Sequence, residues 1–362
     1  MERKTLGVAV IGAGRIGTLR ARIAAAHPAV GFLAVADLDA SRARALAETV
    51  GASFSSGDNL EVISRPEVNA VIVSSSEFAH TLPVIQTLER GKPVLVEKPI
   101  ALRLEDADRM LAAAARAGAE LRVGYSQRFK RRYLLGKEQI LQGRLGRILG
   151  GTGRVYNTRA QAFQILRRAP QASPVTDVLT YWVDMTCWFL EGNAPTEVVA
   201  RGNGVVFREA GFTTDDVTWA ILTFANGATV SLGVCYALPE KFPTIGQSIR
   251  LEILGTEGVL LIDEDHKDQV LYTERGIPHG YVPGHVVNMA FLGSSSSGDW
   301  ALGDFWGPVG SETRAWLDHL ATGRTCALAT AQEARRTLEV TLAIEAAVRS
   351  GHAVKLPLTK EE

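Results

Sequence analysis

Five short apolar runs in the first third of the chain alternate with segments of helical periodicity, and this alternation restricts the possible folds strongly. The apolar runs occupy residues 6–11, 32–36, 70–73, 94–96 and 121–123. They are too apolar for half-exposed strands, which predicts a sheet covered on both faces. The helical patterns between them occupy residues 18–27, 41–50, 79–90 and 104–117. Strand and helix in strict succession predict right-handed crossovers and a doubly wound parallel α/β domain over residues 1–125.

Residues 126–362 predict a second, α+β domain with a large, mainly antiparallel sheet. Candidate strands, rich in Val, Ile, Thr and aromatic residues, lie at 149–158, 198–206, 217–224, 229–236, 248–254, 259–262 and 269–272. Turn sequences at 225–228 and 255–258 predict hairpins between successive strands. Helical patterns occupy residues 131–142, 174–190, 311–321 and 330–350. Residues 276–308 show no period and predict a long loop, in which Trp300, Trp306, His279 and His285 are candidates to cover a pocket.

The composition disfavours several classes of partner. The chain has 39 Lys and Arg residues against 39 Asp and Glu residues, so no net positive charge attracts nucleic acid or anionic lipid. No run approaches the roughly 18 apolar residues of a membrane span. The three cysteines, Cys187, Cys235 and Cys326, are widely spaced and form no CxxC motif. This pattern predicts neither disulfides nor a metal site, and we expect a cytoplasmic protein without a nucleic-acid or membrane partner.

A glycine motif, Gly12-Ala13-Gly14-Arg15-Ile16-Gly17, connects the first predicted strand to the first helix. Gly12 permits a tight turn, Gly14 lets the backbone approach a pyrophosphate, and Gly17 lets the helix pack closely on the sheet. The helix start from Arg15 and Ile16 onward presents unpaired N–H groups to the anion. The context predicts a dinucleotide-binding Rossmann domain.

The residue that ends the second predicted strand indicates which dinucleotide is bound. Asp37 is placed to accept hydrogen bonds from both adenosine ribose hydroxyls, and its charge repels a 2′-phosphate. We therefore expect NAD as the cofactor, with NADP less favoured. Arg42, in the next helix, would reduce that preference.

Two further strand ends carry polar residues at the same predicted edge of the sheet. Ser74-Ser75-Ser76 follows the third strand of the series, and small side chains there leave room for a cofactor. Ser76 is equally suited to cap the next helix, and His80 is expected to be structural or adjacent to the cofactor. The fourth strand ends in Glu97-Lys98-Pro99, which places Glu97 and Lys98 beside a bound nicotinamide. The positive ring of the oxidised cofactor would favour proton transfer by Lys98.

These motifs, together with Gly-Tyr-Ser-Gln-Arg-Phe at 124–129, resemble the glucose-fructose oxidoreductase/inositol dehydrogenase/rhizopine-catabolism (Gfo/Idh/MocA) family over nearly the whole chain. The resemblance implies that Lys98 assists proton transfer and that a helix of the second domain supplies Asp177. It also implies a site residue four positions later, where the family most often has His and this chain has Tyr181. Because Tyr181 replaces this histidine, histidine is not available as the base. We therefore expect Lys98 or Tyr181 to exchange the proton of the substrate hydroxyl, while Asp177 positions a hydroxyl or Lys98.

The sequence around these two residues supports a helix that begins at Ser173 and Pro174. Asp177 would then lie near the positive helix end, with Tyr181 on the same face. A core tyrosine bonded to backbone is the alternative for Tyr181. Arg154 and Tyr156, on the predicted strand 149–158, are candidates for substrate contact, although a solvated sheet face or a subunit interface would account for them equally well.

The sequence thus predicts an NAD(P)-dependent oxidoreductase that transfers a hydride between nicotinamide and a secondary alcohol or ketone of a sugar, cyclitol or related polyol. The large sheet is expected to pair with another subunit in a homodimer or homotetramer. One alternative is a dihydrodiol or carboxylated cyclic-alcohol dehydrogenase, with a carboxylate site built from Arg159, Arg167 and Arg168. Another is a non-catalytic nucleotide-binding regulator on the same fold, which would be expected to lack the lysine.

Overall fold

The computed structural model describes residues 4–169, 172–240, 247–264, 270–278, 286–291, 299–301 and 304–359. The chain forms two compact units, one of residues 1–129 and 296–338, the other of residues 130–295 and 339–362. The domain boundary predicted from the sequence lies after residue 125, and it assigns residues 296–338 to the second domain. In the structure these residues pack within the first unit. Helical periodicity predicts that a segment has a buried face, but it does not specify the partner of that face.

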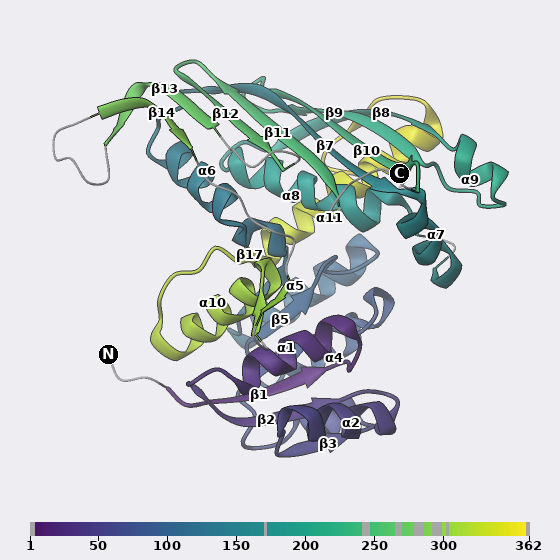
Figure 1. Ribbon diagram of the computed structural model, residues 1–362. Helices are drawn as coiled ribbons and strands as arrows, with labels where there is room; N and C mark the ends of the chain where they lie inside the picture. Colours follow the sequence, from purple (N-terminus) through teal and green to yellow (C-terminus); the bar gives the residue numbers. More distant parts are fainter. Residues whose placement is uncertain are drawn as a thin grey trace. The chain divides into compact units, whose positions relative to one another are not determined.

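The first unit contains a doubly wound parallel sheet, as predicted (Figure 1). Its strand order is β17-β6-β5-β4-β1-β2-β3, and all neighbours are parallel except β17, which runs antiparallel to β6. The strands are β1 (Leu6–Ile11), β2 (Val30–Ala36), β3 (Phe54–Ser56), β4 (Ala70–Val73), β5 (Val94–Glu97), β6 (Leu121–Gly124) and β17 (Ala329–Thr330). Because β1 lies between β2 and β4, the strand order reverses there, and ligands of such sheets bind at the carboxyl ends of the strands at this point.

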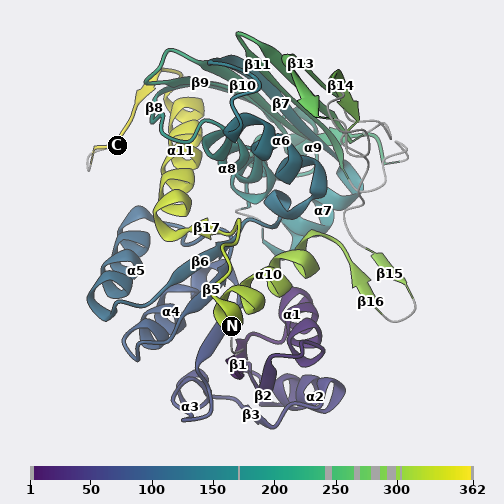
Figure 2. The same ribbon diagram turned by 90° about the vertical axis from the view of Figure 1, so that its left-hand side faces the viewer.

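The first unit also contains several helices and short helical turns. The helices are α1 (Arg15–Ala25), α2 (Ala40–Val50), α3 (Asn59–Ile63), α4 (Thr81–Leu88), α5 (Leu104–Ala117) and α10 (Pro308–Thr322), with the short turns η1 (Glu77–Ala79) and η2 (Ser126–Phe129). The Asp39 side chain caps α2 by accepting hydrogen bonds from the backbone N–H groups of Ser41 and Arg42. Helix α4 lies beside α5, and α1 lies beside α10 (Figure 2).

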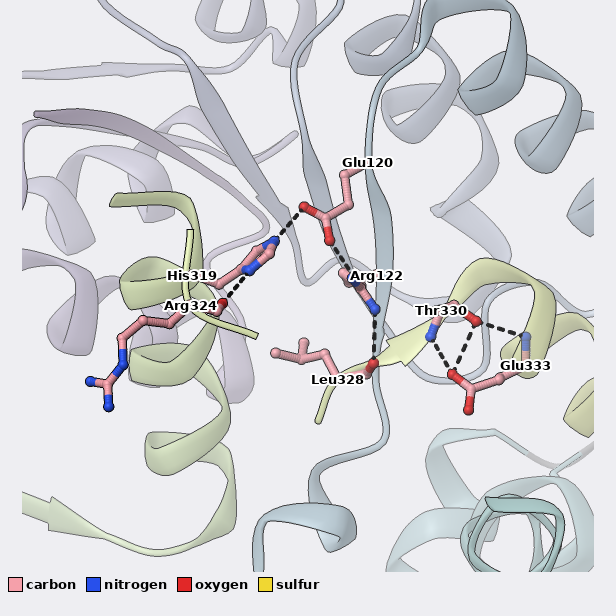
Figure 3. A network of polar contacts seen from close by, with 7 residues as sticks. All are labelled: Glu120, Arg122, His319, Arg324, Leu328, Thr330 and Glu333. Atoms are coloured by element: carbon pink, nitrogen blue, oxygen red, sulfur yellow. Dashed lines mark hydrogen bonds and ion pairs between the residues drawn. The ribbon is translucent and has the colours of Figure 1, made fainter. Parts of the chain in front are cut away.

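Polar contacts fix α10 and β17 to the edge of this sheet (Figure 3). His319 on α10 contacts the Glu120 carboxylate through Nε2 at 3.0 Å, and the other carboxylate oxygen of Glu120 accepts from Arg122. Arg122 also donates to the backbone oxygen of Leu328 at 3.2 Å. Thr330 and Glu333 bond reciprocally at the start of the last helix, α11 (Ala331–Ser350). The segment after α10 is therefore held to the first unit by both backbone and side-chain bonds.

The second unit contains a sheet of nine described strands, in the order β14-β13-β12-β11-β7-β10-β9-β8-β18. These are β7 (Ile148–Thr158), β8 (Pro195–Asn203), β9 (Val217–Phe224), β10 (Thr229–Leu238), β11 (Ser248–Gly255), β12 (Gly258–Asp263), β13 (Val270–Pro278), β14 (Val286–Phe291) and β18 (Val354–Lys355). Neighbours are antiparallel except β7 and β10. The predicted mainly antiparallel sheet is confirmed.

Helices cover one face of this sheet, which we call the inner face, and we call the opposite face the outer face (Figure 1). The helical segments of the second unit are α6 (Arg131–Leu141), α7 (Arg159–Arg168), η3 (Val175–Leu179), α8 (Thr180–Phe189), α9 (Val205–Glu209) and part of α11. Trp182 of α8 packs against Gly153 of β7, and Gly136 of α6 packs against Leu260 of β12. Side chains on alternate strand positions therefore face either these helices or the outer face.

Two predictions of local structure are wrong. Residues 276–308 are not an aperiodic loop throughout, because they include the end of β13, all of β14, and the hairpin of β15 (Asp299–Ala301) and β16 (Asp304–Trp306). Such short strands are stabilised by pairing rather than by a readable period. His279 and His285 lie outside the described residues, and so does the side chain of Trp300, whereas the Trp306 side chain is 63% exposed. The strand predicted to reach residue 206 ends at Asn203, and helix α9 follows it.

Within the described parts of the chain, no helix combines the length and the apolar character that crossing a membrane requires. None of the three cysteines, all of which are described, is in a disulfide.

Candidate active site

The three glycines of the motif, which runs from the end of β1 into the first turn of α1, differ in the space that surrounds them. Gly12 has a φ of 102°, and a Cβ there would lie 2.7 Å from the backbone oxygen of Ser74. A Cβ at Gly17 would lie 1.8 Å from the backbone oxygen of Gly12, so only glycine permits this close packing of α1 on the loop. Gly14 is different, since the nearest atom to its Cβ position would be Arg42 Nη2 at 3.9 Å. The backbone at Gly14 is therefore open to a ligand.

This loop fits a dinucleotide pyrophosphate. Gly14 is the N-cap of α1 and offers no capping side chain, so N–H groups of Arg15, Ile16 and Gly17 in the first turn are suited to an anion. Ser74, at the end of β4, flanks the same loop, and its Oγ is buried without a hydrogen-bond partner among the described residues. An open backbone, a helix N-terminus and an unsatisfied hydroxyl together are the features that a bound dinucleotide would use.

Asp37 lies at the end of β2, where its carboxylate contacts the glycine loop. Its Oδ2 accepts from the backbone N–H of Ala13 at 2.7 Å, and its Oδ1 accepts from that of Asp39 at 3.0 Å. Arg42 on α2 donates from Nη2 to the backbone oxygen of Ala13 at 3.2 Å. An acidic side chain at the end of β2 and a basic side chain of α2 therefore both contact the backbone of the glycine loop.

The residues after β4 connect to the segment after β5 through His80, which is buried. The His80 ring contacts the backbone oxygen of Pro99 through Nδ1 at 3.0 Å and that of Ser75 through Nε2 at 3.2 Å. Burial lowers the pKa of His80, so the ring is neutral near pH 7. Ser76 is the N-cap residue of η1 but makes no capping bond through its side chain. The His80 ring thus lies between the two strand ends, and its place beside a bound cofactor stays a prediction.

Glu97 and Lys98 lie at the end of β5, and both are partly exposed. Glu97 is bonded to Arg20 of α1, which comes three residues after Gly17. The glycine loop, the Ser74 edge and the Lys98 segment all follow neighbouring strands β1, β4 and β5 of one parallel sheet. The first unit therefore gathers the predicted cofactor residues and Lys98 at one edge.

In the second unit, a polar cluster lies under the inner face of the sheet. The Tyr236 hydroxyl on β10 donates a short hydrogen bond to Asp177 Oδ2 in η3. Burial raises the pKa of Tyr236 well above its usual value, and the Asp177 carboxylate and Tyr181 raise it further. Asn157 on β7 is fully buried and lowers the pKa of Tyr236, although neither end of its amide makes a hydrogen bond of ordinary geometry within the described residues. A cluster with unused hydrogen-bonding capacity on an apolar face is suited to a polyhydroxylated ligand.

The helix that carries Asp177 and Tyr181 begins as predicted but is wound differently. Ser173 Oγ accepts from the backbone N–H of Val175 at 3.0 Å, so Ser173 does cap the segment. Residues 175–179 form a π-helical turn, and α8 begins only at Thr180. Such turns are common at functional sites. Asp177 and Tyr181 are both half-buried. Tyr181 raises the pKa of Tyr236, and Asp177 accepts its hydrogen bond, so the structure brings both residues to this cluster.

Arg154 and Tyr156 do not join this cluster. Both lie on the outer face of β7, where the Arg154 guanidinium lies 4.5 Å from the centre of the Tyr156 ring and donates to Ser248 Oγ at 2.8 Å. The residues of β7 that face the helices are those between them, Val155 and Asn157, which are fully buried. Successive side chains of a strand point to opposite faces, so Arg154 and Tyr156 lie on the face that the alternative of a solvated sheet face or a subunit interface requires.

Sequence reasoning missed Tyr236 and Asn157. Both lie on strands that the sequence predicts, and a hydrophobic alternation in 230–236 indicates which positions face the core. That alternation places Tyr236 on the apolar face, where a tyrosine needs a partner.

Of the residues proposed for a carboxylate site, Arg159 donates to the backbone oxygen of Ala237 at 3.1 Å. Within the described residues, no group of three or more His, Cys, Asp or Glu side chains is arranged to hold a metal ion.

The fold and these residues define a dinucleotide-binding oxidoreductase with a second, sheet-based domain, and comparison with known proteins makes this specific. Residues 6–125 match the oxidoreductase family with an NAD-binding Rossmann fold, and residues 133–261 match the GFO/IDH/MocA C-terminal domain. The chain belongs to the Gfo/Idh/MocA family, and the resemblance seen in its motifs is confirmed. It is therefore an NAD-binding oxidoreductase.

Several relatives are named as inositol dehydrogenases. The chain is 29% identical to myo-inositol 2-dehydrogenase of Thermotoga maritima over 277 residues, which cover 74% of this chain and 78% of the relative. It is 26% identical to inositol 2-dehydrogenase of Rubrobacter xylanophilus over 98% of this chain and 94% of the relative. The structure of scyllo-inositol dehydrogenase from Lactobacillus casei with bound NAD(H) and scyllo-inositol has the same fold, with a TM-score of 0.78 at 19% identity over 97% of this chain and 99% of that one.

Proposed function

We propose that the protein oxidises a secondary hydroxyl of a cyclitol or related sugar polyol, or reduces the corresponding ketone, with NAD in preference to NADP. The observation that carries this proposal is the cluster of Tyr236, Asp177 and Asn157, three polar side chains gathered on the helix-covered face of the sheet in the second unit. The names of the relatives, inositol dehydrogenases among them, support the same substrate class. NAD, when bound, supplies or accepts the hydride.

We assign the cofactor to the glycine loop, with Gly12, Gly14, Arg15, Ile16 and Gly17 at the pyrophosphate. The other residues proposed for the cofactor site are Asp37 at the adenosine ribose and Ser74, Ser75, Ser76, His80, Glu97 and Lys98 along the neighbouring strand ends. His80 acts through the backbone it holds, since both of its ring nitrogens contact backbone oxygens.

Four residues are proposed to orient the substrate hydroxyl or to exchange its proton. Tyr236 remains protonated at neutral pH, because burial raises its pKa, so it donates hydrogen bonds and does not act as a base. Asp177 accepts the Tyr236 hydrogen bond and is half-buried, and we assign it the role of positioning a substrate hydroxyl or Lys98. Proton exchange then falls to Lys98 or Tyr181, each of which can exchange a proton in a suitable environment.

The experiment is a substrate screen of the full chain. It monitors NADH absorbance with myo-inositol, scyllo-inositol, glucose and a cyclic dihydrodiol, each with NAD and with NADP. Turnover of an inositol or sugar with NAD supports the proposal. Turnover of the dihydrodiol alone would replace the substrate class, and cofactor binding without turnover of any member of the panel would favour a regulator.

The proposal includes pairing of the outer face with a second copy of this chain. Large side chains on this face are exposed by between 42% and 47%, namely Trp219, Ile221, Leu254, Leu261 and Tyr272. Exposed apolar surface of this kind marks interaction sites. Light scattering should give a dimer or tetramer that Ile221→Lys converts to monomer, whereas Leu141→Lys on α6 should not. An unmodified protein that is monomeric would contradict the proposed pairing of subunits. We also propose that the protein is cytoplasmic.

A further inference from the structure

A fully buried arginine joins three elements of the first unit, and one of its partners lies at the predicted cofactor edge. Arg20 lies on α1, three residues after Gly17, and its side chain has no exposed surface. Its Nε donates to Glu97 Oε1 at 2.6 Å, its Nη2 to Glu312 Oε2 at 2.6 Å, and its Nη1 to Thr313 Oγ1 at 2.8 Å. The planar guanidinium therefore connects α1 to the end of β5 and to helix α10 in fixed directions.

The neighbouring strand β6 leaves room for this arrangement. Gly124 pairs with Glu97 across the two strands, and a Cβ at Gly124 would lie 2.8 Å from Arg20 Nη2. The same Cβ would lie 3.3 Å from a carboxylate oxygen of Glu97 and of Glu312. Glycine at this position thus lets the two carboxylates and the guanidinium meet. Helix α10 is also held at its other end, where His319 contacts the sheet edge (Figure 3).

Glu97 differs from the two charged residues around it in its exposure. The side chains of Arg20 and Glu312 have no exposed surface, whereas that of Glu97 is 16% exposed. Although burial lowers the pKa of Arg20, the carboxylates of Glu97 and Glu312 raise it above its usual value, so the guanidinium stays ionised. Of these three charged groups, Glu97 is therefore the one that a bound molecule can reach.

The strand order indicates which half of a dinucleotide Glu97 would contact. The glycine loop follows β1, which lies between β2 and β4, and β5 lies beyond β4. Asp37 follows β2 and Glu97 ends β5, so the two carboxylates lie on opposite sides of the loop. With the adenosine ribose at Asp37, as proposed, a pyrophosphate on the loop directs the nicotinamide riboside half toward β4 and β5. Glu97 is therefore on the side of that half.

Stability alone gives a weak reason for such a cluster. Removing charges from water is costly, and buried ion pairs often stabilise a fold no better than apolar residues of similar volume. A group that binds a ligand must instead be held in one orientation by neighbours whose own positions are fixed. Arg20, whose two other contacts both lie on α10, provides that support for the Glu97 carboxylate.

We propose that Arg20 is a positioning residue for cofactor binding, which acts by holding the Glu97 carboxylate toward the nicotinamide riboside half of NAD. Glu312 and Thr313 fix the guanidinium, and the guanidinium fixes Glu97. A carboxylate held in this way suits the hydroxyl groups of a ribose and the positive ring of the oxidised cofactor. The inference rests on the proposed function, in which Glu97 belongs to the cofactor site.

Equilibrium binding to the full chain, without substrate, tests this role. Isothermal titration calorimetry gives the Kd of NAD and the Kd of ADP, which lacks the nicotinamide riboside. In Arg20→Lys, a compact ammonium cannot hold three acceptors in the directions of a guanidinium, so Glu97 loses its fixed position. The Kd of NAD should rise about tenfold, as expected for weakening a hydrogen bond to a charged group, whereas the Kd of ADP should stay within about twofold.

A double variant shows whether Arg20 acts through Glu97. Glu97→Gln should weaken NAD binding by a similar factor, and Arg20→Lys/Glu97→Gln should bind no more weakly than Glu97→Gln, because the contact that Arg20 supports is already lost. Arg22→Lys is the matched control, since Arg22 lies on the same helix and is exposed, and it should leave both Kd values unchanged. Should Arg20→Lys fail to fold, Thr313→Val removes only the Nη1 contact and should raise the Kd of NAD about threefold, half of the effect on a logarithmic scale.

The outcomes separate this inference from the proposed function. Unchanged NAD binding in Arg20→Lys, or in Thr313→Val where it replaces Arg20→Lys, would overturn the positioning role. An equal loss of NAD and ADP binding would also overturn it, by showing a general effect on the first unit, and so would a double variant that shows the full product of the two single effects. Failure to turn over any cyclitol or sugar would instead contradict the proposed function, while the binding ratios would still report on Arg20.

Discussion

The hydroxyl of Tyr236 donates a hydrogen bond to the carboxylate of Asp177, across the boundary between strand β10 and the π-helical turn that precedes α8. This bond holds the Asp177 carboxylate through its Oδ2 oxygen. It also ties the helix start to the sheet at the point where Asn157 is buried without an ordinary partner. The relationship makes the cluster a prepared polar site rather than a set of separate side chains.

Tyr236→Phe should reduce activity more than stability. A hydrogen bond to a charged group contributes about 1.5–3 kcal/mol, so kcat/KM for an inositol substrate should fall by roughly 10- to 100-fold. Asp177 is half-buried, and water can replace part of the lost bond in the free protein. Tyr156→Phe, on the outer face of β7, is the control and should be active. Steady-state kinetics check both variants, and similar loss in the two would contradict the assignment of the inner face.

Asp37→Ser should narrow the preference for NAD over NADP. The substitution removes the charge that repels a 2′-phosphate, while Arg42 remains on the same loop to attract it. Titration of each dinucleotide should show the ratio of their Kd values shift by about tenfold or more, equivalent to ~1.4 kcal/mol. Adding Arg42→Ala should reverse part of that shift. Tighter binding of NADP than of NAD by the unmodified protein would refute the prediction.

Lys98→Met should affect turnover far more than cofactor binding. Loss of a positioned acid or base lowers kcat by a factor of about 10²–10⁴, whereas NAD affinity should stay within about threefold. Turnover by NADH absorbance and NAD affinity by fluorescence titration make the comparison. Near-normal turnover would show that Lys98 is a turn residue without a part in the chemistry.

Tyr181→Phe should remove much of the activity if Tyr181 shares proton exchange with Lys98. The pH–rate profile should lose or shift one limb, because a limb reports the ionisation of an essential group. Tyr181→His should retain part of the activity, since histidine can carry a proton over a similar distance. An unchanged profile in Tyr181→Phe would assign the exchange to Lys98 alone.

Glu312→Gln should change how stability depends on pH. Burial raises the pKa of Glu312 from its ordinary 4.5 to about 7, so the folded state binds a proton that the unfolded state releases between these values. The resulting stabilisation is complete below pH 4.5 and is lost as pH rises through about 7. Urea denaturation at about pH 5 and about pH 8 should show the unmodified protein losing roughly 1–3 kcal/mol more than the variant over this interval. Parallel pH profiles for the two proteins would contradict a raised pKa at Glu312.

Local signals were sufficient for the parallel strands and the glycine loop of the first unit, but not for residues 296–338. A tight turn at Gly12 and a close helix contact at Gly17 each require glycine for a steric reason, so the glycine motif is readable from its spacing alone. The strand ends at Asp37 and Lys98 are readable as well, because parallel strands bring their carboxyl ends to one edge. In the second unit, β7 was predicted, but the sequence left open which of its faces carries Arg154 and Tyr156, and the structure places both on the outer face.

The sequence by itself determined the doubly wound sheet, the glycine loop, the position of Asp37 at the end of the second strand, and the Asp177–Tyr181 spacing, because each depends on neighbours within a few turns or strands. The tertiary structure decided the rest. Tyr236 reaches Asp177 across 59 positions, and Arg20 reaches Glu312 across 292, through contacts that no local period encodes. Both pairs form because burial leaves a polar group with no water, and the partner that satisfies it is whichever side chain the packing of distant elements brings within hydrogen-bond distance.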